Sequence, residues 1–310
     1  MHEALLEVEN LVKNYGTYAA VNGISFSVPR GKVIGLLGPN GAGKTTTIQV
    51  LLGITLGNGG SIKYFGKDFF TNRQYCLQRI NFTSSFNTLQ GRNTVWENLL
   101  VFAYLYSIKK PEKKIRELTQ YFEITDLLGQ IFYSLSQGQK TIVNVVKSFI
   151  NDPELILMDE PTASLDPDIA DKLLGLIENF KKTKNTSILY TSHDMDEVTR
   201  ICDEVIFLDK GQIIVQDTPL GLTKRIANSR LKITFDGEKN AVGNFLQAEK
   251  QSFNFQSDKV VIIDTQEEAV PKLIFSLSKA GVWITDIEVE KPTLEDFFLQ
   301  IARGNKNVRK

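Results

Sequence analysis

The spacing of apolar positions in the first part of the chain predicts a sheet around one glycine-rich loop. Residues 5–12 alternate partly, residues 24–29 alternate strictly, and residues 61–66 form a short strand that ends in a turn. Residues 32–37 are a mainly apolar run closed by glycine, which is typical of a buried strand. Residues 46–52 then have helical spacing. We therefore expect strand, glycine loop and helix in direct succession within a mixed sheet.

From about residue 86 the pattern changes to helical spacing. Residues 95–106 have helical spacing, with Thr94 as a candidate N-cap and Glu97 at the capping-box position. Two further helical stretches are expected at residues 115–122 and 125–128, after a charged break at residues 109–114. The pattern predicts a helical subdomain at about 86–140, inserted into the α/β domain.

Later segments return to the strand pattern and extend the sheet. A helix is expected at residues 140–149, and buried strands are expected at residues 155–160 and 187–192. Residues 205–215 predict a hairpin with Lys210 and Gly211 in its turn. We therefore assign residues 1–224 to one α/β domain.

The remainder of the chain alternates between strand and helix patterns without a cluster of chemically reactive residues. Strands are expected at 230–235, 259–264 and 282–289, and helices are expected at 267–280 and 294–302, the last capped by Thr293. This order predicts a small ferredoxin-like α+β domain over residues 225–305, followed by a basic tail at 306–310.

Composition sets limits on the kinds of partner. The 310 residues contain 36 basic and 36 acidic side chains, so no global field favours nucleic acid, and the basic run at 109–114 is interpreted as a solvated face. The cysteines, Cys76 and Cys202, give neither a disulfide framework nor a metal spacing. No apolar run approaches the roughly 18 residues of a membrane span, and no signal peptide is expected. Any link to a membrane should therefore go through a partner.

The glycine loop carries the most specific chemical motif. Residues 38–45 read GPNGAGKT and match G-x-x-x-x-G-K-[ST], the phosphate-binding loop called Walker A. Its backbone N–H groups and the following helix N-terminus favour phosphate oxygens. Lys44 is expected to reach the β- and γ-phosphates, and the Thr45 hydroxyl is expected to ligate Mg²⁺.

Three other motifs are interpreted as parts of the same phosphate-binding site. Asp159 and Glu160 follow four apolar residues, the Walker B pattern, so Asp159 would hold Mg²⁺ through water and Glu160 would polarise the attacking water. His193 ends a strand on the same side and is interpreted as a γ-phosphate contact, although lone histidines are more often structural. The pentad LSQGQ at 135–139 opens a helix and is, taken alone, equally a helix cap.

Tyr15 lies between two predicted strands. It is compatible both with stacking on adenine and with an ordinary half-buried tyrosine, and the residues themselves leave that choice open.

Together these motifs resemble the ATP-binding subunits of ABC transporters over about residues 4–222. The resemblance implies the α/β fold of a P-loop NTPase cassette with its helical insertion, and it makes the C-terminal domain similar to that of subunits serving ABC-2-type exporters. The nucleotide-binding residues that it implies are Tyr15, Gly38, Pro39, Asn40, Gly41, Ala42, Gly43, Lys44, Thr45 and Thr46. The signature motif, which acts on the nucleotide of a second subunit, is Ser136, Gln137, Gly138 and Gln139, and the D-loop is Ser164, Leu165 and Asp166. Glu160 and His193 match catalytic positions, and Thr45 and Asp159 match the metal ligands.

Two positions depart from the family pattern. Gln137 replaces a glycine of the signature. Ser85 stands at the Q-loop position, where the family has a glutamine that touches Mg²⁺ or the attacking water. Gln90 lies five residues further on and does not fit the register, but backbone shifts are an alternative that would bring it into the role.

The family mechanism implies ATP with Mg²⁺, a homodimer that closes on ATP, and a separate integral membrane permease docked on the helical insertion. The chain would then lie at the cytoplasmic face of the membrane, through the permease and without a span of its own. Two rivals from other classes are a soluble ABC protein that remodels ribosomes or DNA, and a P-loop kinase. The first usually has two fused cassettes or a coiled-coil insertion, and the second does not explain the signature pentad.

Overall fold

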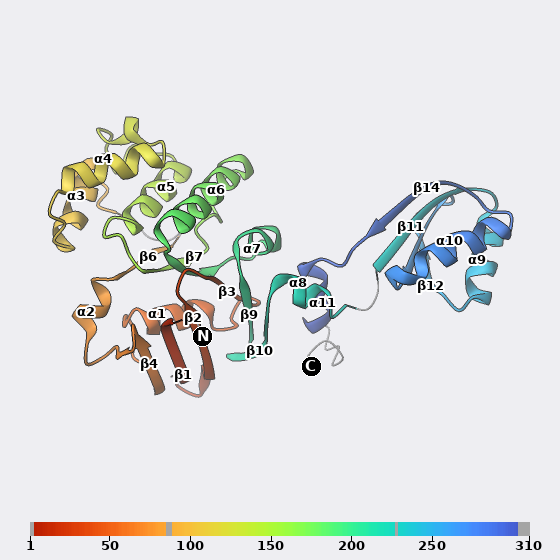
Figure 1. Cartoon of the computed structure of the whole chain (residues 1–310), viewed down its shortest axis with the longest axis horizontal. Helices are drawn as coiled ribbons and strands as arrows, with labels where there is room; N and C mark the ends of the chain where they lie inside the picture. Colours follow the sequence, from red (N-terminus) through yellow and green to blue (C-terminus); the bar gives the residue numbers. More distant parts are fainter. Residues whose placement is uncertain (1–2, 85–88, 227–228, 303–310) are drawn as a thin grey trace. The chain divides into compact units, whose positions relative to one another are not determined.

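The central sheet of the N-terminal unit holds the elements that the motifs occupy. The computed structural model describes residues 3–84, 89–226 and 229–302, and it divides the chain into two units, Met1–Pro219 and Leu220–Lys310 (Figure 1). The first unit contains a six-stranded sheet in the order β10-β9-β3-β8-β7-β6. Its strands are β3 (Val33–Leu37), β6 (Ile80–Ser84), β7 (Leu155–Asp159), β8 (Ser187–Thr191), β9 (Glu204–Asp209) and β10 (Gln212–Asp217).

This sheet is parallel except at β10, which pairs antiparallel with β9. Strands β3, β7 and β8 are buried at every position, which explains why their sequences are continuous apolar runs. The predicted β9–β10 hairpin is confirmed, with Lys210 and Gly211 both at positive φ in its turn. Because parallel strands end at one edge, the residues that follow β3, β7 and β8 are brought together there.

A second, antiparallel sheet of the same unit has the order β2-β1-β4-β5. Its strands are β1 (Ala4–Tyr15), β2 (Tyr18–Pro29), β4 (Gly59–Tyr64) and β5 (Lys67–Asp68), with α1 (Lys44–Leu51) and α2 (Arg73–Leu77) as neighbouring helices. One apolar core includes Val8 and Ile62 of this sheet, Ile48 of α1, and Leu36 and Leu157 of the six-stranded sheet. Helix α1 is therefore packed in the core that joins the two sheets.

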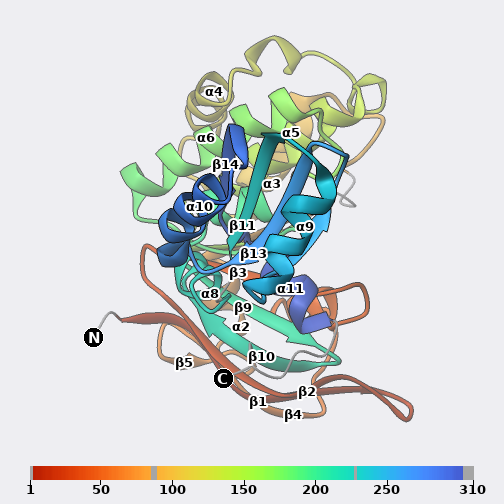
Figure 2. The same ribbon diagram turned by 90° about the vertical axis from the view of Figure 1, so that its right-hand side faces the viewer.

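The predicted helical insertion forms a lobe of its own. Figures 1 and 2 both show its helices at one end of the unit and β1, β2 and β4 at the other. The lobe contains α3 (Val95–Leu105), α4 (Pro111–Tyr121) and α5 (Gln137–Ser148), and α6 (Pro167–Lys184) and α7 (Met195–Ile201) follow β7 and β8. The capping box of Thr94 and Glu97 is confirmed at α3.

Three predicted helix limits in this lobe are wrong. Helix α4 begins at Pro111, inside the expected charged break, because proline is favoured at the first helical position. Residues 125–127 form a 3₁₀ turn and not an α-helix. Helix α5 begins at Gln137 and not at residue 140, because Ser136 and Gln139 form a capping box that places the start within the pentad.

Helix α5 and the segment after it are attached to the edge strand β6 by polar side chains. Lys147 Nζ donates to the carbonyl oxygen of Phe82 at 2.5 Å, and Asn151 Nδ2 donates to the carbonyl oxygen of Ile80 at 3.1 Å. Asn81 Nδ2 also donates to Asn151 Oδ1 at 2.8 Å. These bonds satisfy the outer edge of β6, so the lobe is attached to the sheet by hydrogen bonds as well as by apolar packing.

The second unit has the element order βαββαβ, the order of a ferredoxin-like fold. Its sheet order is β12-β13-β11-β14, and every neighbouring pair is antiparallel. The elements are α8 (Pro219–Thr223), β11 (Ser229–Asp236), α9 (Lys239–Ala248), β12 (Ser252–Phe255), β13 (Val260–Thr265), α10 (Val270–Lys279), β14 (Trp283–Glu290) and α11 (Leu294–Ala302). Side chains of α9 and α10 share one core with β11 and β13, so both helices cover the same face.

The burial of Lys147 makes stability depend on pH. Burial lowers the pKa of Lys147 from 10.5 to about 8, so above pH 8 the unfolded chain binds more protons at this group than the folded chain does. The free energy of unfolding should then rise from pH 7 to pH 10 by about 2.5 kcal/mol more in the wild type than in Lys147→Met. Urea unfolding of both proteins at these pH values measures the difference. Parallel pH profiles would contradict it.

Candidate functional site

The glycine loop between β3 and α1 is pressed against two other backbone segments. Gly38 has φ 146° and Gly43 has φ 105°, both in the region that favours glycine. A Cβ at Gly38 would lie 2.2 Å from the carbonyl oxygen of Leu208, and one at Gly43 would lie 2.3 Å from the carbonyl oxygen of Ala20. Helix α1 begins at Lys44, two residues earlier than expected, directly after the loop. The N–H groups at the start of this helix would therefore face an anion in the loop.

Lys44 is folded into this loop. Its Nζ donates to the carbonyl oxygens of Gly38 at 2.6 Å and Pro39 at 3.2 Å, and the residue is 8% exposed. Burial lowers the pKa of Lys44, while the charges of Glu160 and Asp159 oppose that change. The loop thus holds a desolvated ammonium group next to two carboxylates.

Asp159 is buried at the end of β7, next to two threonines. Thr191 Oγ1 donates to Asp159 Oδ1 at 2.7 Å, and the Thr45 side chain is near enough to lower the pKa of the same carboxylate. Burial raises the pKa of Asp159. The structure therefore brings together Thr45 and Asp159, which lie far apart in the sequence.

Glu160 and His193 also meet at this edge. Glu160 has φ 48°, a strained value for a non-glycine residue, and its N–H donates to Thr191 at both the carbonyl oxygen (3.1 Å) and Oγ1 (3.0 Å). Glu160 Oε2 lies 3.5 Å from His193 Nδ1. The histidine side chain is 69% exposed, so one face of this pair is open to a ligand.

The oxygen donors present fit Mg²⁺. In the part of the chain that the structure describes, no group of three or more His, Cys, Asp or Glu side chains is placed to hold a metal ion. Mg²⁺ in nucleotide sites usually takes only one or two protein ligands and completes its shell with phosphates and water. Thr45 and Asp159, which lie close together in the structure, supply that small set.

The signature and D-loop residues contact each other within the chain. Ser164 Oγ and Thr141 Oγ1 of α5 are 3.2 Å apart, and a Cβ at Gly138 would lie 3.5 Å from Leu165 Cδ2. Asp166 occupies the N-cap position of α6. Helix α5 belongs to the helical lobe, whereas α1 lies beside the antiparallel sheet of β1, β2 and β4 (Figure 1). The pentad is therefore built onto the D-loop and not into the phosphate loop of its own chain.

Two tyrosines flank the turn between β1 and β2. Tyr15 is 48% exposed, and Lys13 Nζ lies 4.9 Å from its ring centroid. Tyr18, which sequence reasoning missed, donates its hydroxyl proton to the carbonyl oxygen of Gly41 at 3.0 Å. The strand register pairs Tyr15 with Tyr18 across the hairpin, which is the signal that links the second tyrosine to the first.

The predicted Q-loop position, Ser85, lies outside the described residues. The preceding residue, Ser84, pairs with Asp159 in the β6–β7 register. The alternative, Gln90, is tied to α3, since its N–H donates to Asn98 Oδ1 and its carbonyl oxygen accepts from Asn98 Nδ2, both at 2.9 Å. The role of either residue stays a prediction.

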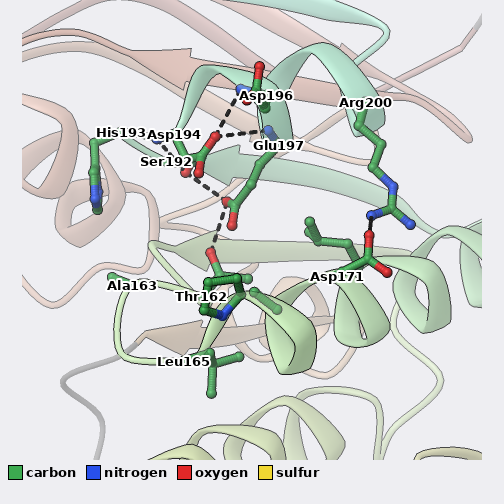
Figure 3. A pocket seen from close by; sticks show the side chains of 13 residues that line it. Thr162, Ala163, Leu165, Asp171, Ser192, His193, Asp194, Asp196, Glu197 and Arg200 are labelled. Carbon is green, nitrogen blue, oxygen red and sulfur yellow. Dashed lines mark hydrogen bonds and ion pairs between the residues drawn. The ribbon is translucent and has the colours of Figure 1, made fainter.

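A pocket of about 490 Å³ opens beside this site (Figure 3). One wall is the D-loop with the start of α6, and the other is α7 with His193 before it. The lining residues are Thr162, Ala163, Leu165, Pro167, Ala170, Asp171, Leu174, Ser192, His193, Asp194, Asp196, Glu197 and Arg200. Sequence reasoning assigned nothing to Glu197, whose side chain extends from the α7 wall towards Thr162 (Figure 3).

Comparisons with known proteins agree with this arrangement. The family described as "ABC transporter" matches residues 21–163. The chain is 30% identical over 309 residues to the linearmycin resistance ATP-binding protein LnrL of Bacillus subtilis, which covers 96% of this chain and 98% of that protein. It is 37% identical over 221 residues to the Nod factor export ATP-binding protein I of Ralstonia nicotianae, covering 69% and 67% respectively.

Solved structures give the same result for the fold. CbiO1 of Clostridium perfringens, part of the ABC transporter complex CbiONQ, superposes with a TM-score of 0.65 at 27% identity, covering 72% of this chain and 92% of that one. Among the described helices, none combines the length and the apolarity that a membrane crossing needs.

The contacts of the glycine loop predict which glycines tolerate a side chain. Gly43→Ala should lower ATP affinity more than 10-fold, because the new Cβ collides with the Ala20 carbonyl as well as straining a positive φ. Gly66→Ala is the matched control, since Gly66 has φ 72° and open space around it, so it should cost only about 1 kcal/mol of stability. Calorimetric titration with ATP and thermal unfolding separate the two effects. Equal ATP affinity in both variants would refute the collision.

Proposed function

This chain belongs to the ATP-binding proteins of the ABC transporter family, and we propose that it hydrolyses ATP to power export through a separate membrane permease. One observation carries the hydrolytic part of this proposal. Lys44, Thr45, Asp159, Glu160 and His193 converge at the shared edge of the parallel sheet, although they come from three separate segments.

Binding of the nucleotide follows from the loop and from Lys44. The phosphates of ATP offer anionic oxygens to the N–H groups of the first turn of α1 and to the buried ammonium group. Lys44 would exchange two neutral carbonyl acceptors for charged phosphate oxygens, which is favourable because the site is desolvated. Tyr15 would stack on the adenine ring, and Tyr18 would support the loop at Gly41.

Thr45 and Asp159 would hold Mg²⁺ together with the phosphates. The ion supplies charge neutralisation at the transferred phosphoryl group. Burial raises the pKa of Asp159. A cation bound next to it would lower that pKa again, because a nearby positive charge favours the ionised carboxylate.

Hydrolysis requires a water molecule aligned with the γ-phosphate. Glu160 would accept a proton from that water. Its backbone N–H donates two hydrogen bonds to Thr191, and its side chain is partly exposed, which supports this role. His193, 3.5 Å from Glu160, would contact the γ-phosphate from its exposed side.

A complete site needs two copies of the chain in this proposal. The signature residues Ser136, Gln137, Gly138 and Gln139 lie at the start of α5 in the helical lobe, so they would act on the nucleotide of the second copy. Closure on ATP and release after hydrolysis would move the permease. The chain would then work at the cytoplasmic face of the membrane, attached through that permease.

The direction of transport rests on the relatives. LnrL is named for linearmycin resistance, and the Ralstonia protein for Nod factor export. LnrL matches this chain over nearly its full length, including the second unit. Export is therefore the direction that we propose here.

Glu160→Gln tests the hydrolytic role. The amide cannot accept a proton, so kcat should fall roughly 100- to 10,000-fold while ATP affinity changes little. The variant should also form a dimer with ATP on size-exclusion chromatography, because closure no longer ends in hydrolysis. Turnover like that of the wild type would overturn the assignment of Glu160.

Lys44→Ala tests the nucleotide site itself. Loss of a charge-assisted contact to the phosphates should weaken ATP binding by roughly 10- to 100-fold. Lys63→Ala, on β4, is the control and should bind ATP like the wild type. Calorimetric titration gives both affinities. Unchanged affinity in Lys44→Ala would mean that ATP binds elsewhere.

A further inference from the structure

One carboxylate oxygen beside the site accepts three hydrogen bonds. Glu197 Oε2 accepts from the hydroxyls of Thr162, Tyr190 and Ser192, each at 2.8 Å. Figure 3 shows the bonds from Thr162 and Ser192 reaching Glu197 from opposite walls of the pocket.

The three donors come from the segments that carry the proposed catalytic pair. Thr162 lies two residues after Glu160 and two residues before the D-loop. Ser192 directly precedes His193, and Tyr190 belongs to the buried strand β8. Glu197 therefore joins the segment after Glu160 to the segment before His193.

Helix α7 holds Glu197 in this position. Asp194 caps the helix by accepting from the N–H groups of Asp196 at 2.9 Å and Glu197 at 3.2 Å. At the other end of the helix, Arg200 forms ion pairs with Asp171 and Glu178 of α6. We call the three hydrogen bonds at Glu197 Oε2 the Glu197 bridge. Helix α7, which holds this bridge, is anchored at both ends, whereas the pocket leaves space along the D-loop.

We propose that Glu197 is a positioning residue that transmits the position of the D-loop to His193. This inference rests on the proposed function, in which Glu160 and His193 act on ATP. A displacement of the D-loop that moves Thr162, two residues before it, would act on the same carboxylate oxygen that holds Ser192. The distance between Glu160 and His193 then depends on the D-loop.

The first test measures turnover in the full-length chain. Glu197→Gln and Glu197→Ala should lower kcat about 10- to 100-fold. ATP affinity and the KM for ATP should stay within about twofold of the wild type, because Glu197 is not among the proposed nucleotide contacts. Asp196→Asn, an exposed neighbour on the same helix, is the matched control and should keep wild-type kcat. Unchanged kcat in both Glu197 variants would overturn the proposal. A joint loss of kcat, ATP affinity and melting temperature would also overturn it, because it would indicate a purely structural role.

The second test does not depend on turnover. The chain has two histidines, His2 and His193, so in a histidine-labelled sample the imidazole NMR signals of His193 are assigned by their loss in His193→Asn. Thr162→Val removes a hydroxyl that bonds to Glu197, and it should shift the His193 signals. Glu197→Ala should shift them as well, and adding Thr162→Val to Glu197→Ala should then have no further effect.

The two tests separate failure of this inference from failure of the proposed function. A wild-type chain that binds ATP without hydrolysing it would refute the hydrolytic function. The NMR experiment would still show whether Glu197 couples Thr162 to His193. Unchanged His193 signals in Thr162→Val would refute the coupling through Glu197, even if the wild type hydrolyses ATP.

Discussion

The parallel pairing of β7 with β8 sets the spacing of the groups in the site. Its register places Asp159 opposite Thr191. Thr191 then donates to the Asp159 carboxylate and accepts from the Glu160 N–H, so one threonine orients two adjacent acids. Both strands are fully buried, which leaves the pairing little freedom to shift without exposing apolar side chains. The other contacts of the site depend on this fixed pair.

Desolvation determines the electrostatics around that pair. Burial lowers the pKa of Lys44 and raises the pKa of Asp159, so each group in isolation is driven towards its neutral form. Their opposite charges partly offset this cost within the site. An anionic nucleotide with a divalent cation would complete the compensation, because each ionised group would gain a nearby opposite charge.

The elements with long apolar runs or a specific motif were predictable. The glycine loop with its flanking strand and helix, the buried strands before Asp159 and His193, and the capping box at Thr94 all agree with the structure. The prediction missed α9 and β12 in the second unit. Strand β12 has only four residues, which is too short for a clear alternation, and α9 buries only Val242, Gly243 and Leu246 of its ten residues.

The sequence by itself determined the order of the motifs and the residue types that can bind phosphate, because these depend on local spacing along the chain. Tertiary structure alone decided which distant hydroxyls meet one carboxylate. Thr162, Tyr190 and Ser192 are ordinary residues in the sequence, and only the approach of the D-loop, β8 and α7 joins them at Glu197. The bond from Lys147 to the edge of β6 arises in the same way. Such contacts leave no periodic signal, since a hydrogen bond requires proximity in space and not a fixed separation in sequence.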